Sequence, residues 1–254
     1  MSKSVVDPNW PRLLGLSVHE LRTPLSVVIG YLRMLDRAGP LNEQQRSLID
    51  LVMKSCGRLG DVIGEMSDLS QIEEGKVTLN RSHIDVRAVL AQAVSALPEL
   101  PDREMHVSLG TGEGPAMLDG DPVRLKTAFT SLLTGLRREV VTTNEFCVRE
   151  QVRRSNGRAE SWITFGPPEL VPALQSSDPN DLTTFNEWRG GCGLSLAIAR
   201  RVIEAHSGHV WERMPDPEPE RTETDRATPL DEDVTGLAPL KVRKTAAVVM
   251  LPLV

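Results

Sequence analysis

The sequence predicts an α + α/β protein, in which a helical hairpin is followed by an α/β sandwich domain. Apolar residues repeat with helical periodicity over residues 14–35 and again over residues 48–69. Strand-like and helix-like segments alternate from about residue 80 onwards. Helical periodicity followed by such alternation is typical of two separately packed parts. We therefore expect a helical domain over residues 1–74 and a sandwich domain over residues 80–254.

The first helix is predicted from a seven-residue repeat with two apolar positions, which is the pattern of a helix that packs in a bundle. Its apolar residues are Leu14, Val18, Leu21, Leu25, Val28, Leu32 and Leu35. The repeat stops at residues 38–42, where Gly39 and Pro40 disfavour a helix and Asn42 can cap the next one. This segment is expected to be a turn between two antiparallel helices.

The second helix has a wide apolar face. One stripe contains Leu48, Val52, Leu59, Val62, Met66 and Leu69, and Ile49, Cys56 and Ile63 lie beside it. A helix with so wide a face contacts more than one neighbour. A single hairpin cannot cover the face, whereas two hairpins can pack as a four-helix bundle. We therefore expect the chain to form a homodimer through its hairpin.

The second domain is expected to place one layer of helices on a mixed sheet. The predicted strands cover residues 104–109, 145–152, 161–165 and 245–252, and a short strand is expected at 76–79. The predicted helices cover residues 86–97, 122–140 and 193–206. Residues 214–240 are rich in proline and acidic groups, and they are interpreted as a flexible insertion.

Composition narrows the classes of partner. The formal charge of −6 argues against nucleic-acid binding, because neutralising phosphates requires a basic surface. The apolar run 246–254 is too short to cross a bilayer, and the first residues lack the pattern of a signal peptide. These features predict a cytoplasmic protein without a membrane segment. Three widely separated cysteines indicate neither a disulfide framework nor a zinc site.

His19 is the first candidate for chemistry. Val18, Leu21 and Leu25 belong to the apolar stripe, so His19 and Thr23, which are four residues apart, are expected on an outward face. Pro24 lies inside the helix and has no N–H for the carbonyl of the preceding turn, which costs about 3 kcal/mol. A carboxylate that holds one imidazole proton frees the other nitrogen for nucleophilic attack. Glu20 is the nearest such carboxylate.

The run His19-Glu20-Leu21-Arg22-Thr23-Pro24-Leu25 resembles the H-box of sensor histidine kinases. The resemblance implies that His19 is phosphorylated and passes the phosphoryl group to an aspartate of a response-regulator receiver domain. It also implies that Glu20 is the acid/base partner and that Thr23 positions water for dephosphorylating the regulator. The alternative is an exposed histidine without function on an amphipathic helix.

The same resemblance implies that the second domain is a GHKL-type (Bergerat-like) ATPase domain. Residues 120–125 resemble the start of the family's N-box helix, and this alignment puts Ser131 and Gly135 at the positions of its two asparagines. The second asparagine holds Mg²⁺ in the family, and a glycine offers no side-chain oxygen for that purpose. Ser131 is the remaining candidate for a contact with phosphate.

Two further segments bear on nucleotide binding. Residues 166–168, Gly-Pro-Pro, occupy the place of the family's Asp-x-Gly-x-Gly turn and contain no aspartate for adenine. Residues 190–208 resemble the second glycine box and its helix, with the aromatic segment 185–189 leading into the ATP lid. Gly191, Gly193 and Leu194 are therefore the expected phosphate contacts, because glycines and a helix N-terminus present backbone N–H groups. His206 and His209 have metal-like spacing, but a helix end followed by a strand explains them more simply.

Together these features predict a two-component histidine kinase that carries a phosphoryl group on His19. Its site for ATP and Mg²⁺ is expected to be degenerate. One alternative is an ATP-independent histidine phosphotransferase or a phosphatase that uses Thr23. Another is a non-enzymatic dimerisation partner that regulates an intact kinase. Because the hairpin begins within about 20 residues of Met1, a separate sensor or kinase partner is expected to supply the input.

Overall fold

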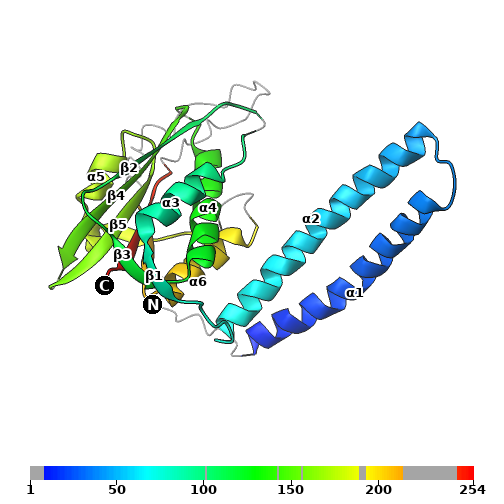
Figure 1. Cartoon of the computed structure of the whole chain (residues 1–254), viewed down its shortest axis with the longest axis horizontal. Coiled ribbons are helices and arrows are strands. Elements are labelled where there is room, and N and C mark those ends of the chain that lie inside the picture. The colour runs from blue at the N-terminus through cyan, green and yellow to red at the C-terminus, as the bar shows by residue number, and fades with distance from the viewer. Residues whose placement is uncertain (1–8, 101, 142, 156, 189–192, 214–244) are drawn as a thin grey trace, which may run out of the picture.

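The computed structural model describes residues 9–100, 102–141, 143–155, 157–188, 193–213 and 245–254. Its first part is a long hairpin of two helices, α1 (Trp10–Arg37) and α2 (Glu43–Glu73). Figure 1 shows the hairpin extending away from the second domain, with only its base close to that domain. The predicted helical hairpin is confirmed.

Asn42 determines where α2 begins. Its side-chain Oδ1 accepts a hydrogen bond of 2.8 Å from the backbone N–H of Gln45, and its own N–H donates to Gln45 Oε1 at 3.0 Å. This reciprocal pair is a capping box, which satisfies two backbone donors that the first helical turn leaves unpaired. The turn at residues 38–42 and the cap at Asn42 both follow the prediction.

The interior of the hairpin differs from the predicted stripe. Val18 and Leu25 of α1 pack against Cys56 and Ile63 of α2, but Leu21 is 45% exposed. The expected stripe of α2 is likewise uncovered in part: Leu48, Val52, Leu59 and Val62 are exposed. Within one hairpin, α1 therefore covers only one flank of the wide apolar face, and the rest of that face lies open.

After α1 and α2, the described residues of the second domain form four α-helices. They are α3 (Val86–Ser95), α4 (Pro122–Glu139), the short α5 (Val171–Gln175) and α6 (Ser195–Ala205), with a single 3-10 turn, η1, at Pro179–Asp181. Helices α3, α4 and α6 were expected within two residues of these bounds. Helix α5 was not predicted, because five residues are too few for a periodic pattern.

The strands of the described residues form one six-stranded and one two-stranded sheet. Their bounds are β1 (Ser82–Asp85), β2 (His106–Thr111), β3 (Met117–Gly120), β4 (Glu145–Ser155), β5 (Arg158–Gly166), β6 (Leu182–Thr184), β7 (His209–Arg213) and β8 (Ala247–Pro252). The large sheet has the order β2-β4-β5-β8-β7-β6, and β1 pairs with β3. In the large sheet β2 and β4 run parallel and the other described pairs run antiparallel, so the sheet is mixed, as predicted.

The large sheet separates two apolar cores. On one face, α3, α4 and α6 cover Ile163, Phe165 and Val249. On the other face, Leu174 of α5 packs with Trp162. Side chains alternate between the faces of a strand, so neighbouring residues of β5 enter different cores. Figure 1 shows α5 on the side of the sheet opposite α3, α4 and α6. The predicted sandwich is confirmed, with this one helix added on its second face.

One prediction about the segment that joins the two parts is wrong. Residues 76–79 form no strand. The strand begins at Ser82, where Gly120 of β3 is available as a partner, and β propensity without a partner does not form a ladder. Asn80 instead donates its backbone N–H to Asp121 at 3.0 Å. The predicted insertion at 214–240 lies outside the described residues.

The described cysteines are buried, and the described helices are too polar or too short to cross a membrane. Cys56 and Cys147 are buried free thiols, and Cys192 lies outside the described residues. Searched over the described ranges, the chain contains no helix that is both long and apolar enough to span a membrane.

Candidate functional site

His19 projects from the base half of α1 into solvent. Its side chain is 78% exposed, and Nδ1 lies 3.4 Å from Oε1 of Glu20, whose side chain is 72% exposed. A carboxylate at this distance favours the proton on Nδ1 and leaves the lone pair on Nε2. The arrangement therefore presents a nucleophilic ring nitrogen to an incoming group.

Thr23 lies one turn after His19 on the same helix. Its hydroxyl donates to the carbonyl oxygen of His19 at 3.4 Å, so it shares the exposed face that the spacing predicts. Pro24 lies inside α1 and cannot donate to the preceding turn. His19, Glu20 and Thr23 are thus gathered on about one turn of helix, as the sequence predicts.

A groove about 440 Å³ in volume runs beside His19 between the two helices. It is lined by Gly15, Val18, His19 and Arg22 of α1, and by Ser67, Ser70, Gln71, Glu74 and Lys76 from α2 and the following linker. Most of these side chains are polar or charged. The groove is open and polar, which suits a protein surface rather than a buried small molecule.

The predicted phosphate contacts lie at the junction of the two parts. Ser131 is half-buried on α4 and lines a cavity of about 490 Å³ between α4, α6 and the end of α2. Gly135 is buried. Gly193 and Leu194 directly precede α6, and the backbone N–H of Leu194 donates to Oε2 of Glu65 at 3.3 Å. The fourth predicted contact, Gly191, lies outside the described residues.

The turn after β5 takes the chain away from α4 and α6. Gly166 is followed by two prolines and by α5, which packs on the opposite face of the sheet. A Cβ on Gly166 would come within 2.7 Å of the Ala246 side chain, so strand packing requires this glycine. Residues 166–175 therefore contribute to the second core rather than to a pocket beside α4.

Asp121 and His206 hold the start of α4. Asp121 accepts from the N–H groups of Val123 and Arg124, each at 3.1 Å. Burial raises the pKa of Asp121, but the backbone hydrogen bonds outweigh burial, so its pKa is lowered overall.

The two nitrogens of His206 both bond to the backbone. Nε2 accepts from Asp121 N–H at 2.9 Å, and Nδ1 lies 2.7 Å from the carbonyl oxygen of Val202. Burial is the main reason that the pKa of His206 is lowered. His209 is exposed and packs on Trp211, with ring centroids 5.4 Å apart. His206 is therefore a structural residue at the end of α6.

Sequence reasoning missed the residues that join the two parts. Glu65 and Glu73 of α2 contact α6 at Leu194 and Arg201. Arg201 lies in a stretch that was interpreted only as the helix after a glycine box. The signal that could have found the junction is charge: α2 is acidic after Arg58, and α6 carries adjacent arginines.

The chain is similar to known proteins in its hairpin and over most of its length. Residues 12–75 match the His Kinase A (phospho-acceptor) domain. The circadian input-output histidine kinase CikA of Synechococcus elongatus is 32% identical over 206 residues, which cover 78% of this chain and 27% of that protein. The sensor protein GacS of Pseudomonas syringae is 27% identical over 202 residues, which cover 76% of this chain and 22% of GacS.

Solved structures show the same fold. Full-length ShkA, crystallised in complex with AMPPNP, matches 96% of this chain and 45% of its own length, with a TM-score of 0.59 and 18% identity. The histidine kinase AdeS of Acinetobacter baumannii matches 92% of this chain and 96% of its own length, with a TM-score of 0.51 and 16% identity. These likenesses concern the arrangement of the elements.

A phosphoacceptor hairpin followed by an ATPase-like domain is the catalytic core of a histidine kinase. The chain belongs to the two-component sensor histidine kinase family. It spans about a quarter of the length of the curated relatives that it matches.

Proposed function

We propose that the chain carries a phosphoryl group on Nε2 of His19 and exchanges it with an aspartate of a response-regulator receiver domain. The observation that carries this proposal is the exposed imidazole with a carboxylate 3.4 Å from its other nitrogen. The open polar groove beside His19 supports docking of a protein rather than of a small metabolite.

Groups at the site and on the receiver account for each bond that forms or breaks in this exchange. The Nε2 lone pair attacks phosphorus, an N–P bond forms, and the P–O bond to the receiver aspartate breaks with the carboxylate as leaving group. The imidazole then carries positive charge, and Glu20 accepts or stabilises the Nδ1 proton. In the reverse direction the same groups return the phosphoryl group to the aspartate. Catalysis therefore rests on positioning and charge.

ATP is the phosphoryl donor that family membership suggests, and ATP with Mg²⁺ would supply the γ-phosphoryl group. The residues at the corresponding place fit it poorly. Gly135 offers no side-chain oxygen for Mg²⁺, and the chain after β5 turns to the opposite face of the sheet. Ser131 is the predicted phosphate contact that lines the cavity beside α4, whereas the backbone N–H of Leu194 already donates to Glu65. We infer that autokinase activity is weak.

This poor fit favours a second candidate function. In that case the chain exchanges phosphoryl groups with receivers without using ATP, or it removes them with Thr23 as the residue that positions water. The ATPase-like domain then serves as a docking surface or regulates a separate kinase partner. The two candidate functions differ in the phosphoryl donor, and in the second one the chemistry falls on His19 when a phosphoryl group is exchanged and on Thr23 when one is removed.

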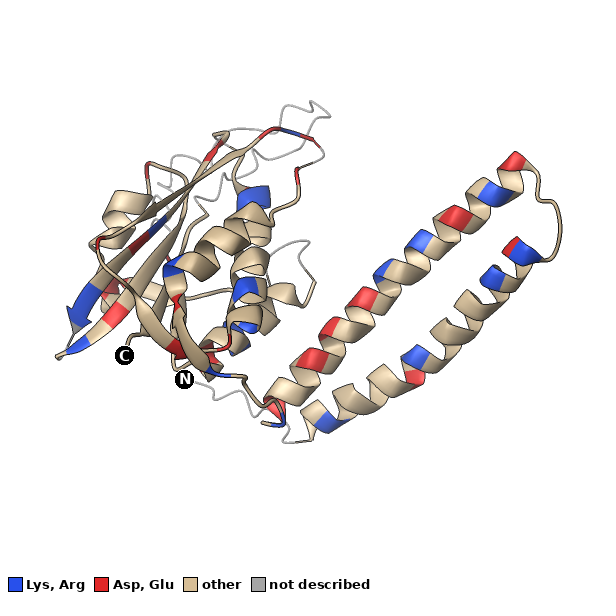
Figure 2. Cartoon of the chain, viewed as in Figure 1, with Lys and Arg blue, Asp and Glu red and all other residues tan. Residues whose placement is uncertain are grey.

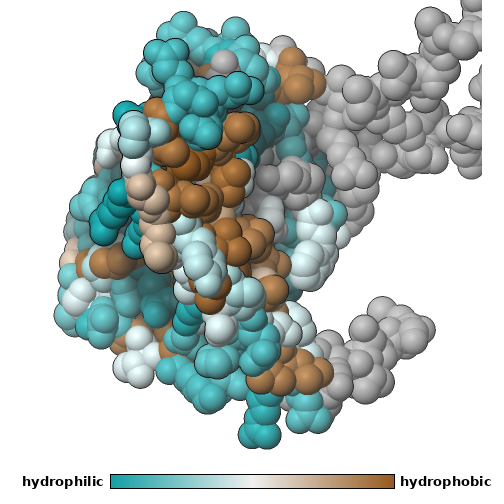
Figure 3. All heavy atoms as spheres, turned by 90° about the vertical axis from the view of Figure 1, so that its right-hand side faces the viewer, coloured by the Kyte–Doolittle hydropathy of each residue, from teal (hydrophilic) through white to brown (hydrophobic). Residues whose placement is uncertain are grey.

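We further propose that the hairpin forms a homodimer. Apolar side chains of both helices are exposed in one hairpin, among them Leu21, Leu35, Leu48, Leu59 and Val62. Figure 3 shows apolar side chains gathered in a stripe on the side of the molecule that carries the hairpin. An apolar stripe of this extent is typical of an interaction surface, and a second hairpin would cover it as a four-helix bundle.

Incubation of the full chain with a receiver domain labelled on its aspartyl phosphate tests the proposal. The label is expected to move to the wild-type chain as an acid-labile phosphohistidine, or to be released as phosphate. His19→Gln is expected to abolish the transfer. His209→Gln, which alters an exposed histidine in the other domain, is the matched control and is expected to behave as the wild type.

The source of the phosphoryl group is tested separately with labelled ATP and Mg²⁺. Slow labelling that is lost in His19→Gln supports the autokinase. Labelling from the receiver without labelling from ATP supports the ATP-independent exchange. If neither donor labels His19 and no phosphate is released from the receivers tested, the proposed chemistry is wrong.

A further inference from the structure

Two polar contacts between described residues join the hairpin to the ATPase-like domain, and Ile72 of α2 also packs against the core of that domain. Oε2 of Glu65 accepts the backbone N–H of Leu194, at the start of α6. Glu73, at the last turn of α2, pairs with Arg201 through the arginine Nε. Both contacts join α2 to α6, and neither involves the groups at His19 that the proposed function uses.

The spacing of the two contacts shows how the helices lie. Glu65 and Glu73 are eight residues apart, which is about 12 Å along α2. Leu194 and Arg201 are seven residues apart, about 10.5 Å along the same direction of α6. The two helices therefore run side by side in parallel over about two turns. A movement of α2 along or about its axis must stretch or break these contacts.

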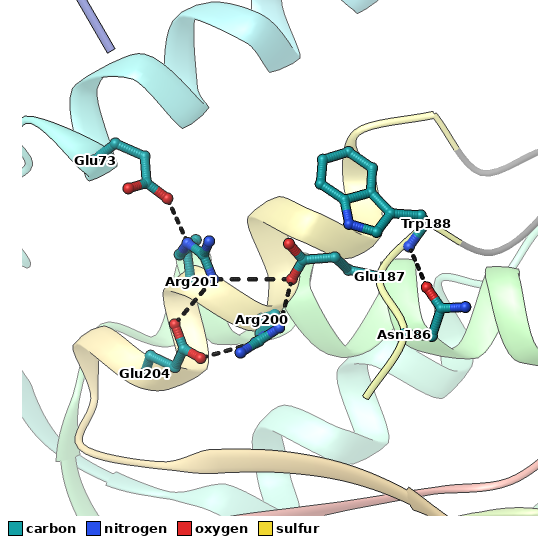
Figure 4. A network of polar contacts seen from close by, with 7 residues as sticks. All are labelled: Glu73, Asn186, Glu187, Trp188, Arg200, Arg201 and Glu204. Carbon is teal, nitrogen blue, oxygen red and sulfur yellow. Dashed lines mark hydrogen bonds and ion pairs between the residues drawn. The ribbon is translucent and has the colours of Figure 1, made fainter. Parts of the chain in front are cut away.

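Arg201 also forms ion pairs with carboxylates of the second domain (Figure 4). Arg201 lies 3.8 Å from Glu187 and 3.2 Å from Glu204, and Arg200 pairs with the same two carboxylates at 3.1 and 2.8 Å. The Glu187 side chain is only 7% exposed. Glu187 belongs to the segment that follows β6 and includes the exposed Trp188. One carboxylate of the hairpin and one of this segment thus share Arg201.

Charge reinforces the contact. The second half of α2 carries acidic residues, as Figure 2 shows, and the last of them, Glu73, pairs with Arg201 of α6. A buried or half-buried carboxylate needs a cationic partner, because desolvation penalises an unpaired charge. If Glu73 left Arg201, Glu187 and Glu204 would have to neutralise both arginines alone, and their geometry would change.

We propose that Glu73 and Arg201 form a releasable latch that couples the position of α2 to the order of residues 185–188. With the latch closed, Arg201 is held between the hairpin and Glu187, and the segment is fixed. When α2 moves and Glu73 separates, Arg201 reorients within the domain and the segment loosens. Regulation through the hairpin would thereby reach the segment beside the glycine-rich turn without any ligand.

α2 is suited to this coupling because its two sides have different neighbours. Ser67, Ser70 and Gln71 line the groove beside His19. Glu65 and Glu73 lie on the side that contacts α6. Rotation of the same helix therefore changes both the surroundings of His19 and the latch.

Amide hydrogen exchange of the full chain, read by mass spectrometry, tests the latch. Glu73→Gln keeps the size of the side chain and removes its charge. It is expected to raise exchange on the order of fivefold in peptides that cover residues 185–188 and α6, which is the effect of losing one partly exposed ion pair. Peptides of β5 are expected to exchange as in the wild type, and they show that the fold is intact.

Two further variants identify the pair. Glu74→Gln is the matched control, because Glu74 is the next residue and pairs with Lys76 at 2.6 Å. Arg201→Gln, which also loses the contacts with Glu187 and Glu204, is expected to raise exchange at least as much as Glu73→Gln. The double variant is expected to exchange no faster than Arg201→Gln alone. High salt should raise exchange more in the wild type than in Glu73→Gln, because the variant lacks the Glu73–Arg201 pair that salt weakens.

Three outcomes would overturn the latch. The first is unchanged exchange at residues 185–188 in Glu73→Gln. The second is an equal increase in Glu74→Gln, which would indicate a general effect of charge. The third is strict additivity of Glu73→Gln and Arg201→Gln, which would mean that the two residues act separately. None of these measurements requires phosphoryl transfer, so failure of the latch leaves the proposed function untouched.

Discussion

The Nδ1 atom of His19 lies 3.4 Å from Oε1 of Glu20, the next residue of the same helix. Consecutive helical residues project in directions about 100° apart, so this contact requires the Glu20 side chain to bend toward the imidazole. Both side chains are exposed, and packing does not impose the contact. The contact between the two side chains is therefore best explained by the chemistry that it permits.

Glu20→Gln is expected to slow phosphoryl transfer to His19 about 100-fold, because an amide cannot take up the Nδ1 proton during attack. The measurement is the initial rate of label transfer from a phosphorylated receiver to the full chain. Glu43→Gln changes an exposed carboxylate at the other end of the hairpin and is expected to keep the wild-type rate. Equal rates for Glu20→Gln and the wild type would refute a role for the carboxylate.

Thr23→Ala is expected to reduce the release of phosphate from a phosphorylated receiver by about tenfold or more, while transfer to His19 remains near the wild-type rate. The reason is that the hydroxyl can hold a water molecule, whereas the transfer step needs only the imidazole. Ser26→Ala removes a hydroxyl with the same bond to the carbonyl four residues earlier, at 2.8 Å. A parallel loss in Ser26→Ala would indicate a general effect on the helix.

Leu59→Glu is expected to convert a hairpin dimer into monomers. Leu59 is 54% exposed in one hairpin, and covering it in a symmetric dimer contributes about 1.5 kcal/mol or more in each copy. The dissociation constant, measured by analytical ultracentrifugation, should rise about 100-fold or more. Arg58→Glu introduces the same side chain at the neighbouring exposed position. If both variants dimerise like the wild type, the interface lies elsewhere.

His206 is expected to make the stability of the second domain depend on pH. Burial lowers its pKa from the ordinary value of 6.5, so below that pH the unfolded chain binds a proton that the folded chain does not. The free energy of unfolding should be greatest above pH 6.5, and the His206 contribution should be lost as the pH falls from there to the lowered pKa. Urea titrations across this range measure the effect.

The control for this pH dependence is a pair of histidine variants. His206→Asn is expected to lower stability at neutral pH, because two backbone groups lose a partner, and to flatten the dependence below pH 6.5. His83→Asn changes an exposed histidine and is expected to leave the dependence intact. A dependence that persists unchanged in His206→Asn would assign it to other groups.

The sequence by itself determined the features that rest on local rules. The heptad spacing specified two helices, Gly39 and Pro40 specified their turn, and Asn42 specified where α2 begins. The same local rules put His19 and Thr23 on one exposed turn. Each of these depends on residues within a few positions of each other, where helical geometry and capping leave little choice.

Only the tertiary structure decided what depends on partners distant in sequence. Strand β1 formed at Ser82 rather than at residues 76–79 because β3 pairs with it there. The segment after β5 crossed to the second face of the sheet because Trp162 offered an apolar surface to α5. Glu73 met Arg201 across 128 residues. Pattern rules describe single elements, whereas pairing, packing and charge neutralisation depend on the element that lies opposite.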